Sequence, residues 1–189
     1  PPWYLDGIGT DWPYSILGTV GVDKSPDFGV GRIPVDTAAQ AQAVLNKIIA
    51  YEKNPPLSAS FYANAAIAAQ FQCCRTGATN PGTDQRTFIQ VSEFARNVMT
   101  NAGKTVQRIY MRTVDPAYGG DPTPRRYYNG TFLPAALSPG SGFAWTGNTT
   151  QIINAWNAGR FLIMHRDHGW HGGWADPLFD SGHIDSLTN

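Results

Sequence analysis

Three of the four histidines in this chain lie within one short stretch, FLIMHRDHGWHGGW, which runs from Phe161 to Trp174. Imidazole is the commonest metal ligand among side chains, and it is also the group best suited to proton transfer near neutral pH. The stretch therefore supports two chemical hypotheses: a metal site that shares several histidines, or a single catalytic imidazole.

The metal hypothesis rests on His165, His168 and His171, with further possible ligands nearby at Asp167, Asp176, Asp180 and His183. These nitrogen and oxygen donors suit zinc or a similar transition metal. Steps of three align side chains on a helix, but the apolar run from Phe161 to Met164 predicts a strand, and the glycines after it argue against a helix. Successive side chains of a strand point to opposite faces, so the spacing does not favour a metal site.

The catalytic hypothesis needs only one imidazole, placed at the rim of a sheet. His168 is followed by Gly169, whose backbone can pass close to a substrate and present its N–H to a developing oxyanion. A histidine in a surface loop, satisfied by water or main chain, would give the same pattern. The pair by itself leaves both interpretations open.

Apolar periodicity predicts alternating strands and helices that would position these residues. Helices are expected at about 37–54, 87–101 and 149–158, and strands at 28–33, 64–72, 105–112 and 161–164. The first helix is expected to bury one face, formed by Ala41, Val44, Leu45, Ile48 and Ile49. The second is expected to bury a stripe formed by Phe88, Val91, Phe94, Ala95, Val98 and Met99.

This alternation predicts a three-layer α/β/α sandwich with a mainly parallel sheet. We expect one partial domain over 1–189, with an N-terminal loop at 1–27, alternating elements at 28–112, a long loop at 113–148, and a final part at 149–189. Ligands of such sheets bind beyond the carboxyl ends of the strands. Cys73, Asp115 and His168 all follow predicted strand ends, and the loop at 113–148, rich in glycine and proline, is a candidate substrate-facing wall.

Composition excludes several classes of partner. Lys plus Arg equals Asp plus Glu at 14 each, and no basic run occurs, so a nucleic-acid partner is not expected. The sequence has no run of eighteen apolar residues and no signal-peptide pattern at its start. Its low charge and many glycines and prolines are common in exported proteins. Cys73 and Cys74 are adjacent, and neighbouring cysteines do not easily adopt ordinary disulfide geometry, so no disulfide is expected.

The order of segments resembles the catalytic region of gingipain-type cysteine peptidases, family C25, whose fold is related to that of caspases. The matching pieces are PDFGVGRIPVDTAAQAQAVLNKIIAYEKNP, TDQRTFIQVSEFARNVMTNAG, TTQIINAWNAGRFLIMHRDHGWHGGWADP and IDSLTN. GRIPV followed by a helix that ends in KIIAYEKNP is the most specific of them. The resemblance implies a secreted or cell-surface cysteine endopeptidase with a truncated caspase-like fold.

The family's Gly-His-Gly segment gives roles to particular residues. His168 takes the place of the catalytic histidine, Gly169 provides one oxyanion N–H, and Trp174 matches the family's tryptophan, a residue expected at the substrate. Two departures occur, since Asp167 replaces the first glycine and bulky residues follow at Trp170 and His171. An aspartate close to the ring would favour imidazolium, or would mark a site that has drifted from catalysis.

The family's nucleophilic cysteine follows this segment by a few dozen residues, so the resemblance places it downstream of Asn189. Without that thiol His168 has nothing to activate, and the chain alone is expected to be inactive. Cys73 or Cys74 could take the role, because they follow a strand at the same sheet edge. A buried cysteine is more often a small apolar residue of the core.

The resemblance also implies a protein or peptide substrate cleaved after Arg or Lys. An acidic group would attract that side chain, and Asp115 and Asp121 are the candidates, although both precede proline as turn-forming aspartates do. Catalysis in the family requires no cofactor, and calcium stabilises loops in some relatives. A non-catalytic C25-like binding or surface module is the alternative function, and the metal site is a second alternative.

Overall fold

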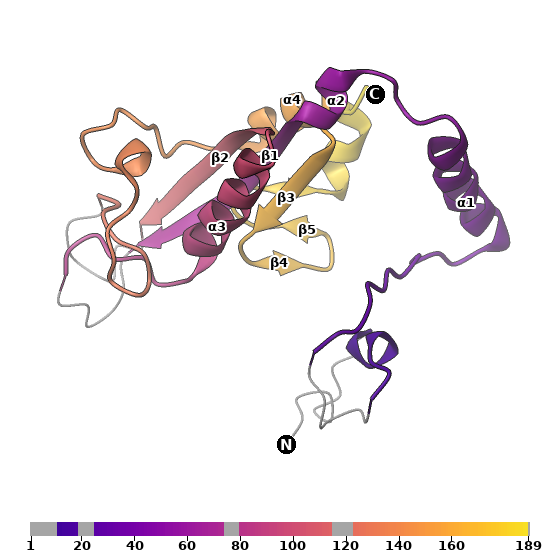
Figure 1. Ribbon diagram of the computed structural model, residues 1–189, viewed down its shortest axis with the longest axis horizontal. Helices are drawn as coiled ribbons and strands as arrows, with labels where there is room; N and C mark the ends of the chain where they lie inside the picture. The colour runs from indigo at the N-terminus through magenta and orange to yellow at the C-terminus, as the bar shows by residue number, and fades with distance from the viewer. Residues whose placement is uncertain (1–10, 19–24, 74–79, 115–122, 189) are drawn as a thin grey trace. The chain divides into compact units, whose positions relative to one another are not determined.

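The computed structural model describes residues 11–18, 25–73, 80–114 and 123–188 (Figure 1). The chain divides into two compact units, Pro1–Pro56 and Leu57–Asn189. Each unit is described below by itself. No helix in the described parts of the chain is long and apolar enough to cross a membrane.

The first unit contains a 3-10 helix, Trp12–Ser15, and the helix α1, Ala38–Lys53. Thr37 caps α1: its hydroxyl accepts from the backbone N–H of Gln40, and the Gln40 side chain accepts from the N–H of Thr37. The prediction of this helix is confirmed. The strand predicted at 28–33 is wrong, because no other described segment pairs with it and a strand needs a ladder partner.

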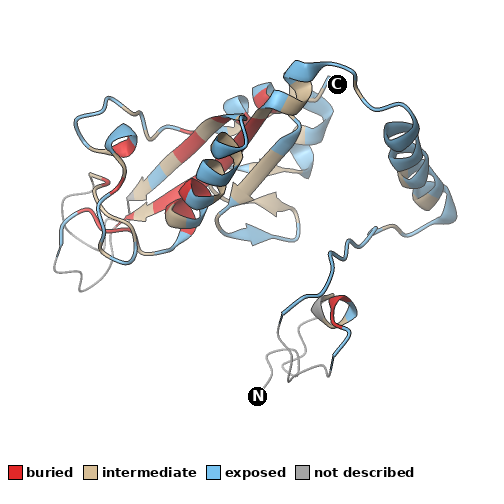
Figure 2. Ribbon diagram, in the orientation of Figure 1, coloured by how far each residue is buried: buried red, intermediate tan, exposed pale blue. Residues whose placement is uncertain are grey.

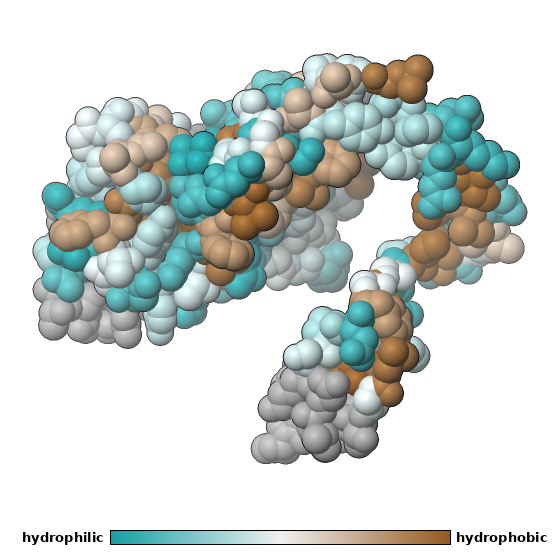
Figure 3. Space-filling model, in the orientation of Figure 1, coloured by the Kyte–Doolittle hydropathy of each residue, from teal (hydrophilic) through white to brown (hydrophobic). Residues whose placement is uncertain are grey.

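The predicted buried face of α1 is also wrong. The helix contains no buried residue, and Leu45, Ile48 and Ile49 are each about two-fifths exposed. Figure 3 shows apolar residues gathered along this helix. The periodicity that indicated an inward face is real, but no described element of the first unit covers it.

The second unit is built on a parallel sheet of three strands: β1, Asn64–Cys73, β2, Thr105–Val114, and β3, Leu162–Arg166. Their order is β2-β1-β3, with Ile67 of β1 opposite Arg108 of β2 and Met164 of β3. β1 is the central strand and is buried along almost its whole length (Figure 2). A continuous apolar run is the pattern of a strand covered on both faces, so the prediction for β1 is confirmed.

Helices cover both faces of this sheet. One core cluster joins Ile89 of α3, Phe88–Asn101, to Ile67 and Phe71 of β1. The other joins Ile152 of α4, Thr149–Asn157, to Ala66 and other small residues on the opposite face of β1. Asn148 caps α4 with a capping box. The α/β fold with a parallel sheet is therefore confirmed (Figure 1).

The inward face of α3 differs from the predicted stripe. Its buried residues are Phe88, Ile89, Ser92 and Glu93, whereas Phe94 is 71% exposed and Val98 is 55% exposed. The carboxylate of Glu93 is bound in the interior by Nε and Nη2 of Arg108, at 2.8 and 2.7 Å, and by the hydroxyl of Tyr110 at 2.8 Å. Because these partners lie on β2, Glu93 faces the interior. The spacing of apolar residues along α3 could not indicate this.

A small antiparallel sheet follows β3, formed by β4, Gly169–Trp170, β5, Gly173–Trp174, and β6, Phe179–Asp180. A 3-10 helix, Ser181–Ser186, comes directly after β6. Among the described strands, β3 pairs only with β1, so the second edge of β3 has no described neighbour. The stretch of histidines thus begins on an edge strand and continues into a tight hairpin.

Candidate functional site

The parallel register brings the strand ends of the second unit to one edge of the sheet. β1 and β2 end opposite each other at Cys73 and Val114, and β3 ends at Arg166. His168 follows β3 by two residues and contacts Gln72 near the end of β1. Cys73 and His168 therefore share this edge, as predicted from the order of strands. Asp115 and Asp121 lie outside the described residues.

The exposed imidazole of His168 is held by two contacts. Its Nε2 lies 3.3 Å from Oε1 of Gln72, and its ring lies perpendicular to that of Phe88 with 5.2 Å between centroids. Because an amide oxygen only accepts, Nε2 must carry the proton in this hydrogen bond. In the neutral ring Nδ1 is then unprotonated and can accept a proton. One contact comes from β1 and the other from the first residue of α3, so both helix and sheet orient the ring.

Gly169 is fixed by the hairpin. It pairs with Trp174, and the flanking bond runs from the N–H of Ala175 to the carbonyl of His168 at 3.0 Å. This pattern makes Gly169 and Trp174 a non-hydrogen-bonded pair, so the N–H of Gly169 points away from β5. A Cβ at Gly169 would lie 3.2 Å from the carbonyl oxygen of Gly173. The hairpin thus favours glycine here and leaves its N–H available for a ligand.

Asp167 is bound to main chain and not to the imidazole ring. Its Oδ2 accepts from the N–H of Asp176 at 2.7 Å, and burial raises the pKa of this half-buried carboxyl. Asp176 in turn accepts from Nε2 of Gln70 at 2.8 Å, and the same nitrogen donates to Thr113. Asp167 therefore links the hairpin to the end of β3, and Asp176 links the hairpin to Gln70 of β1.

The other histidines lie in separate environments. The ring of His165 stacks on Trp174 at 4.6 Å between centroids, and burial lowers the pKa of His165 to about 4, so it is neutral. Nδ1 of His183 lies 2.8 Å from Asp180, and His171 is exposed. Trp174 is engaged with His165 and Phe179, and its contact with substrate stays a prediction.

The described ranges contain no set of side chains that could ligate a metal ion. No group of three or more His, Cys, Asp or Glu side chains there could hold a metal ion. The described residues of the histidine stretch therefore offer no shared transition-metal site, and structural calcium in the loops stays a prediction.

Cys73 does not offer a thiol. Cys73 is fully buried and disulfide-bonded, which corrects the expectation that no disulfide forms. The only other cysteine of the chain, Cys74, lies outside the described residues. A sulfur in a disulfide is not a thiolate, so Cys73 does not supply the nucleophile for His168.

Asp84 organises the segment that follows β1, and nothing in its sequence context singles it out. Its Oδ1 accepts from the N–H of Gln72 at 3.2 Å and from that of Arg86 at 3.1 Å. Its Oδ2 is buried without a hydrogen-bond partner among the described residues. Burial raises the pKa of Asp84 to about 8. The side chain thus fixes the backbone of Gln72, the residue that contacts His168.

Because the folded-state pKa of Asp84 lies above its ordinary value, its stabilising contribution is complete below about pH 4 and is lost as the pH rises through about 8. We expect the free energy of unfolding to fall between pH 5 and pH 9 by on the order of 3 kcal/mol. In Asp84→Asn this fall should be largely absent. Urea unfolding of both proteins at the two pH values measures it, and equal falls in both would contradict the assignment.

Gln72 is the residue through which β1 orients His168. Gln72→Leu keeps the side-chain volume but removes the acceptor, so we expect the ring of His168 to become mobile. The order parameter of its Cε1–H bond, from NMR relaxation, should fall from a rigid value near 0.85 to below about 0.6. Gln42→Leu on α1 is the matched control and should leave it unchanged. A ring that stays rigid in Gln72→Leu would show that Phe88 alone holds it.

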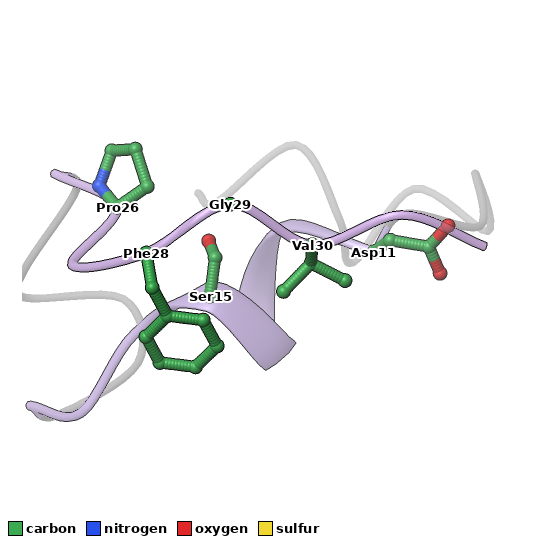
Figure 4. Close-up of a pocket in the computed structure, with 6 residues that line it drawn as sticks. All are labelled: Asp11, Ser15, Pro26, Phe28, Gly29 and Val30. Carbon is green, nitrogen blue, oxygen red and sulfur yellow. The ribbon is translucent and has the colours of Figure 1, made fainter. Parts of the chain in front are cut away.

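Two cavities have linings that do not include His168. One of about 510 Å³ belongs to the first unit and is lined by Asp11, Ser15, Pro26, Phe28, Gly29 and Val30 (Figure 4). The other, of about 340 Å³, is lined by Arg112 and by part of the predicted loop between 123 and 146. That loop is ordered by bridges such as Thr83 with Arg126, and by the packing of Leu133 and Leu137. It forms a hollowed surface beyond β2, and its role as a substrate-facing wall stays a prediction.

The site residues that sequence patterns missed are Gln70, Gln72, Phe88 and Asp84. The two glutamines do carry a signal, since they are polar positions at the carboxyl end of an otherwise apolar strand. Phe88 has no such signal in the sequence, because it is indistinguishable from any apolar residue at the start of an amphipathic helix. Gln72 and His168 are 96 positions apart, so only the fold pairs them.

Comparison with known proteins gives one family. The sequence model of Peptidase family C25 matches residues 1–189, the whole chain. No curated protein and no solved structure matched the chain. The family consists of cysteine peptidases, and the parallel sheet with helices on both faces suits its caspase-like fold. With the whole length matched, the chain belongs to peptidase family C25.

Proposed function

We propose that this chain supplies the histidine side of a cysteine endopeptidase site, and that the nucleophilic cysteine lies downstream of Asn189. The observation that carries the proposal is the exposed imidazole of His168, oriented by Gln72 and Phe88 at the carboxyl edge of a parallel sheet. The second edge of β3 has no described neighbour. A following strand that pairs there would end beside His168 and could present a thiol.

The proposed reaction uses the two nitrogens of His168 differently. Nε2 donates to Gln72, and Nδ1 takes the proton of the thiol. The thiolate attacks the peptide carbonyl carbon, and the oxyanion that forms accepts from the N–H of Gly169. The imidazolium then gives its proton to the leaving amine, which leaves a thioester on the enzyme. Water, deprotonated by the imidazole, hydrolyses the thioester and restores the thiol.

The non-catalytic alternative rests on Asp167 and Trp170. The hydrogen bond from the backbone of Asp176 to Asp167 fastens the hairpin, which supports a structural role for Asp167 beside a working His168. Cleavage after Arg or Lys and secretion belong to the same proposal. The acidic candidates for that specificity, Asp115 and Asp121, lie outside the described residues.

The proposal is tested by expressing a longer gene product that extends beyond Asn189 to the proposed cysteine. We expect it to hydrolyse peptides at an internal bond, and alkylation of its thiol to abolish the activity. Peptides that differ only in having Arg, Lys or Leu before the scissile bond measure the specificity. A folded protein that turns over none of them would contradict the enzymatic function and favour the binding module.

A further inference from the structure

Trp170 is an exposed aromatic residue two positions beyond His168. Its side chain is 44% exposed, although its backbone is held in β4 opposite Gly173. The indole folds over the turn of the hairpin, since a Cβ on Gly172 would lie 2.7 Å from its Nε1. The carbonyl of His168 accepts from the N–H of Ala175 and so continues the ladder of β4. Because residues two apart along an extended chain project to the same side, Trp170 and His168 extend from the same side of this segment. This is an ordered aromatic surface beside the proposed catalytic group.

The two carboxylates near this surface each accept a hydrogen bond within the fold. Asp167 binds the N–H of Asp176, and the carboxylate of Asp176 binds Gln70. On the other side, the guanidinium of Arg166 lies over the ring of Phe88 at 5.3 Å. The described contacts of the His168 ring are therefore the amide of Gln72 and the ring of Phe88, and the guanidinium of Arg166 lies over that same phenyl ring. Such a surface suits a large apolar or aromatic side chain and disfavours a basic one.

The chemistry of the proposed function fixes which side of the substrate meets Trp170. The imidazolium of His168 must reach the nitrogen of the leaving amine, so the ring stands on the leaving-group side of the scissile bond. From these positions we infer that Trp170 contacts the residue that follows the scissile bond and selects a large apolar or aromatic side chain there. This inference rests on the proposed function and adds a specificity determinant to it.

The test uses the gene product that contains the downstream cysteine, in three forms: wild type, Trp170→Phe and Trp170→Ser. Two peptides differ only in having Phe or Ser after the scissile bond. We expect wild type to cleave the Phe peptide with kcat/KM about 10-fold higher, in the range that apolar pockets achieve. Trp170→Phe should keep most of this ratio and Trp170→Ser should bring it near one. The preference for the residue before the scissile bond should stay the same in all three.

The outcomes separate the two claims. If the three proteins cleave both peptides with the same ratio, Trp170 does not select the leaving-group residue, and the endopeptidase function stands. If wild type cleaves neither peptide while its thermal unfolding shows a folded protein, both claims fail. A ratio that falls in Trp170→Ser and is retained in Trp170→Phe supports the inference, because a change in folding alone would lower both rates equally.

Discussion

Replacement of His168 by alanine is expected to lower kcat/KM of the longer gene product at least about 1000-fold, because thiol activation and protonation of the leaving amine both depend on this ring. The fold should survive, since the imidazole is exposed and its ring contacts in the described part of the chain are those with Gln72 and Phe88. Hydrolysis of an internally quenched peptide measures the activity, and thermal unfolding measures the stability.

His171→Ala is the matched control for this experiment. His171 lies three positions further along the same hairpin and is exposed. We expect its loss to change kcat/KM less than about 2-fold, since the proposed proton transfers do not involve it. If His168→Ala and His171→Ala kept similar activity, the histidine of the site would have been assigned wrongly.

The largest effect on stability is expected at Glu93. Glu93→Ala leaves the guanidinium of Arg108, whose side chain is only 15% exposed, and the hydroxyl of Tyr110 without their shared partner. Removing one member of a buried ion pair costs about 3–5 kcal/mol. We expect a loss of that size in the free energy of unfolding, measured by urea denaturation.

Glu52→Ala on α1 is the control for Glu93, because its carboxylate is exposed and the change should stay within about 0.5 kcal/mol. A loss at Glu93 no larger than at Glu52 would show that the contacts with Arg108 and Tyr110 do not hold α3 on the sheet. The same contacts support the proposed site, since α3 begins with Phe88, which packs against His168.

Elements encoded by local signals were predictable from the sequence. The apolar run of β1 and the capping residues Thr37 and Asn148 each act within a few positions, and the structure has the strand and both helices where they were expected. The parallel sheet followed from their alternation. The turn that begins after β3 and contains Gly169 was predictable in the same way, because an apolar strand followed by several glycines indicates a turn at the edge of the sheet.

Features that depend on distant partners were not predictable. Glu93 turns inward because Arg108 and Tyr110 lie on β2, and the segment 28–33 is not a strand because nothing described pairs with it. The hydrogen bond that the carboxylate of Asp167 accepts from the backbone of Asp176, nine positions on, was likewise not predictable. Each of these outcomes is decided by which groups the fold brings together.

The central claim is that His168 activates a cysteine downstream of Asn189. The most direct measurement is alkylation of the longer gene product by a peptide chloromethyl ketone, followed by mass spectrometry of the labelled peptide. We predict one label, on a cysteine beyond Asn189, and a rate of labelling that falls at least about 100-fold in His168→Ala. Labelling at Cys73 or Cys74, or at a rate that does not change when His168 is replaced, would contradict the claim.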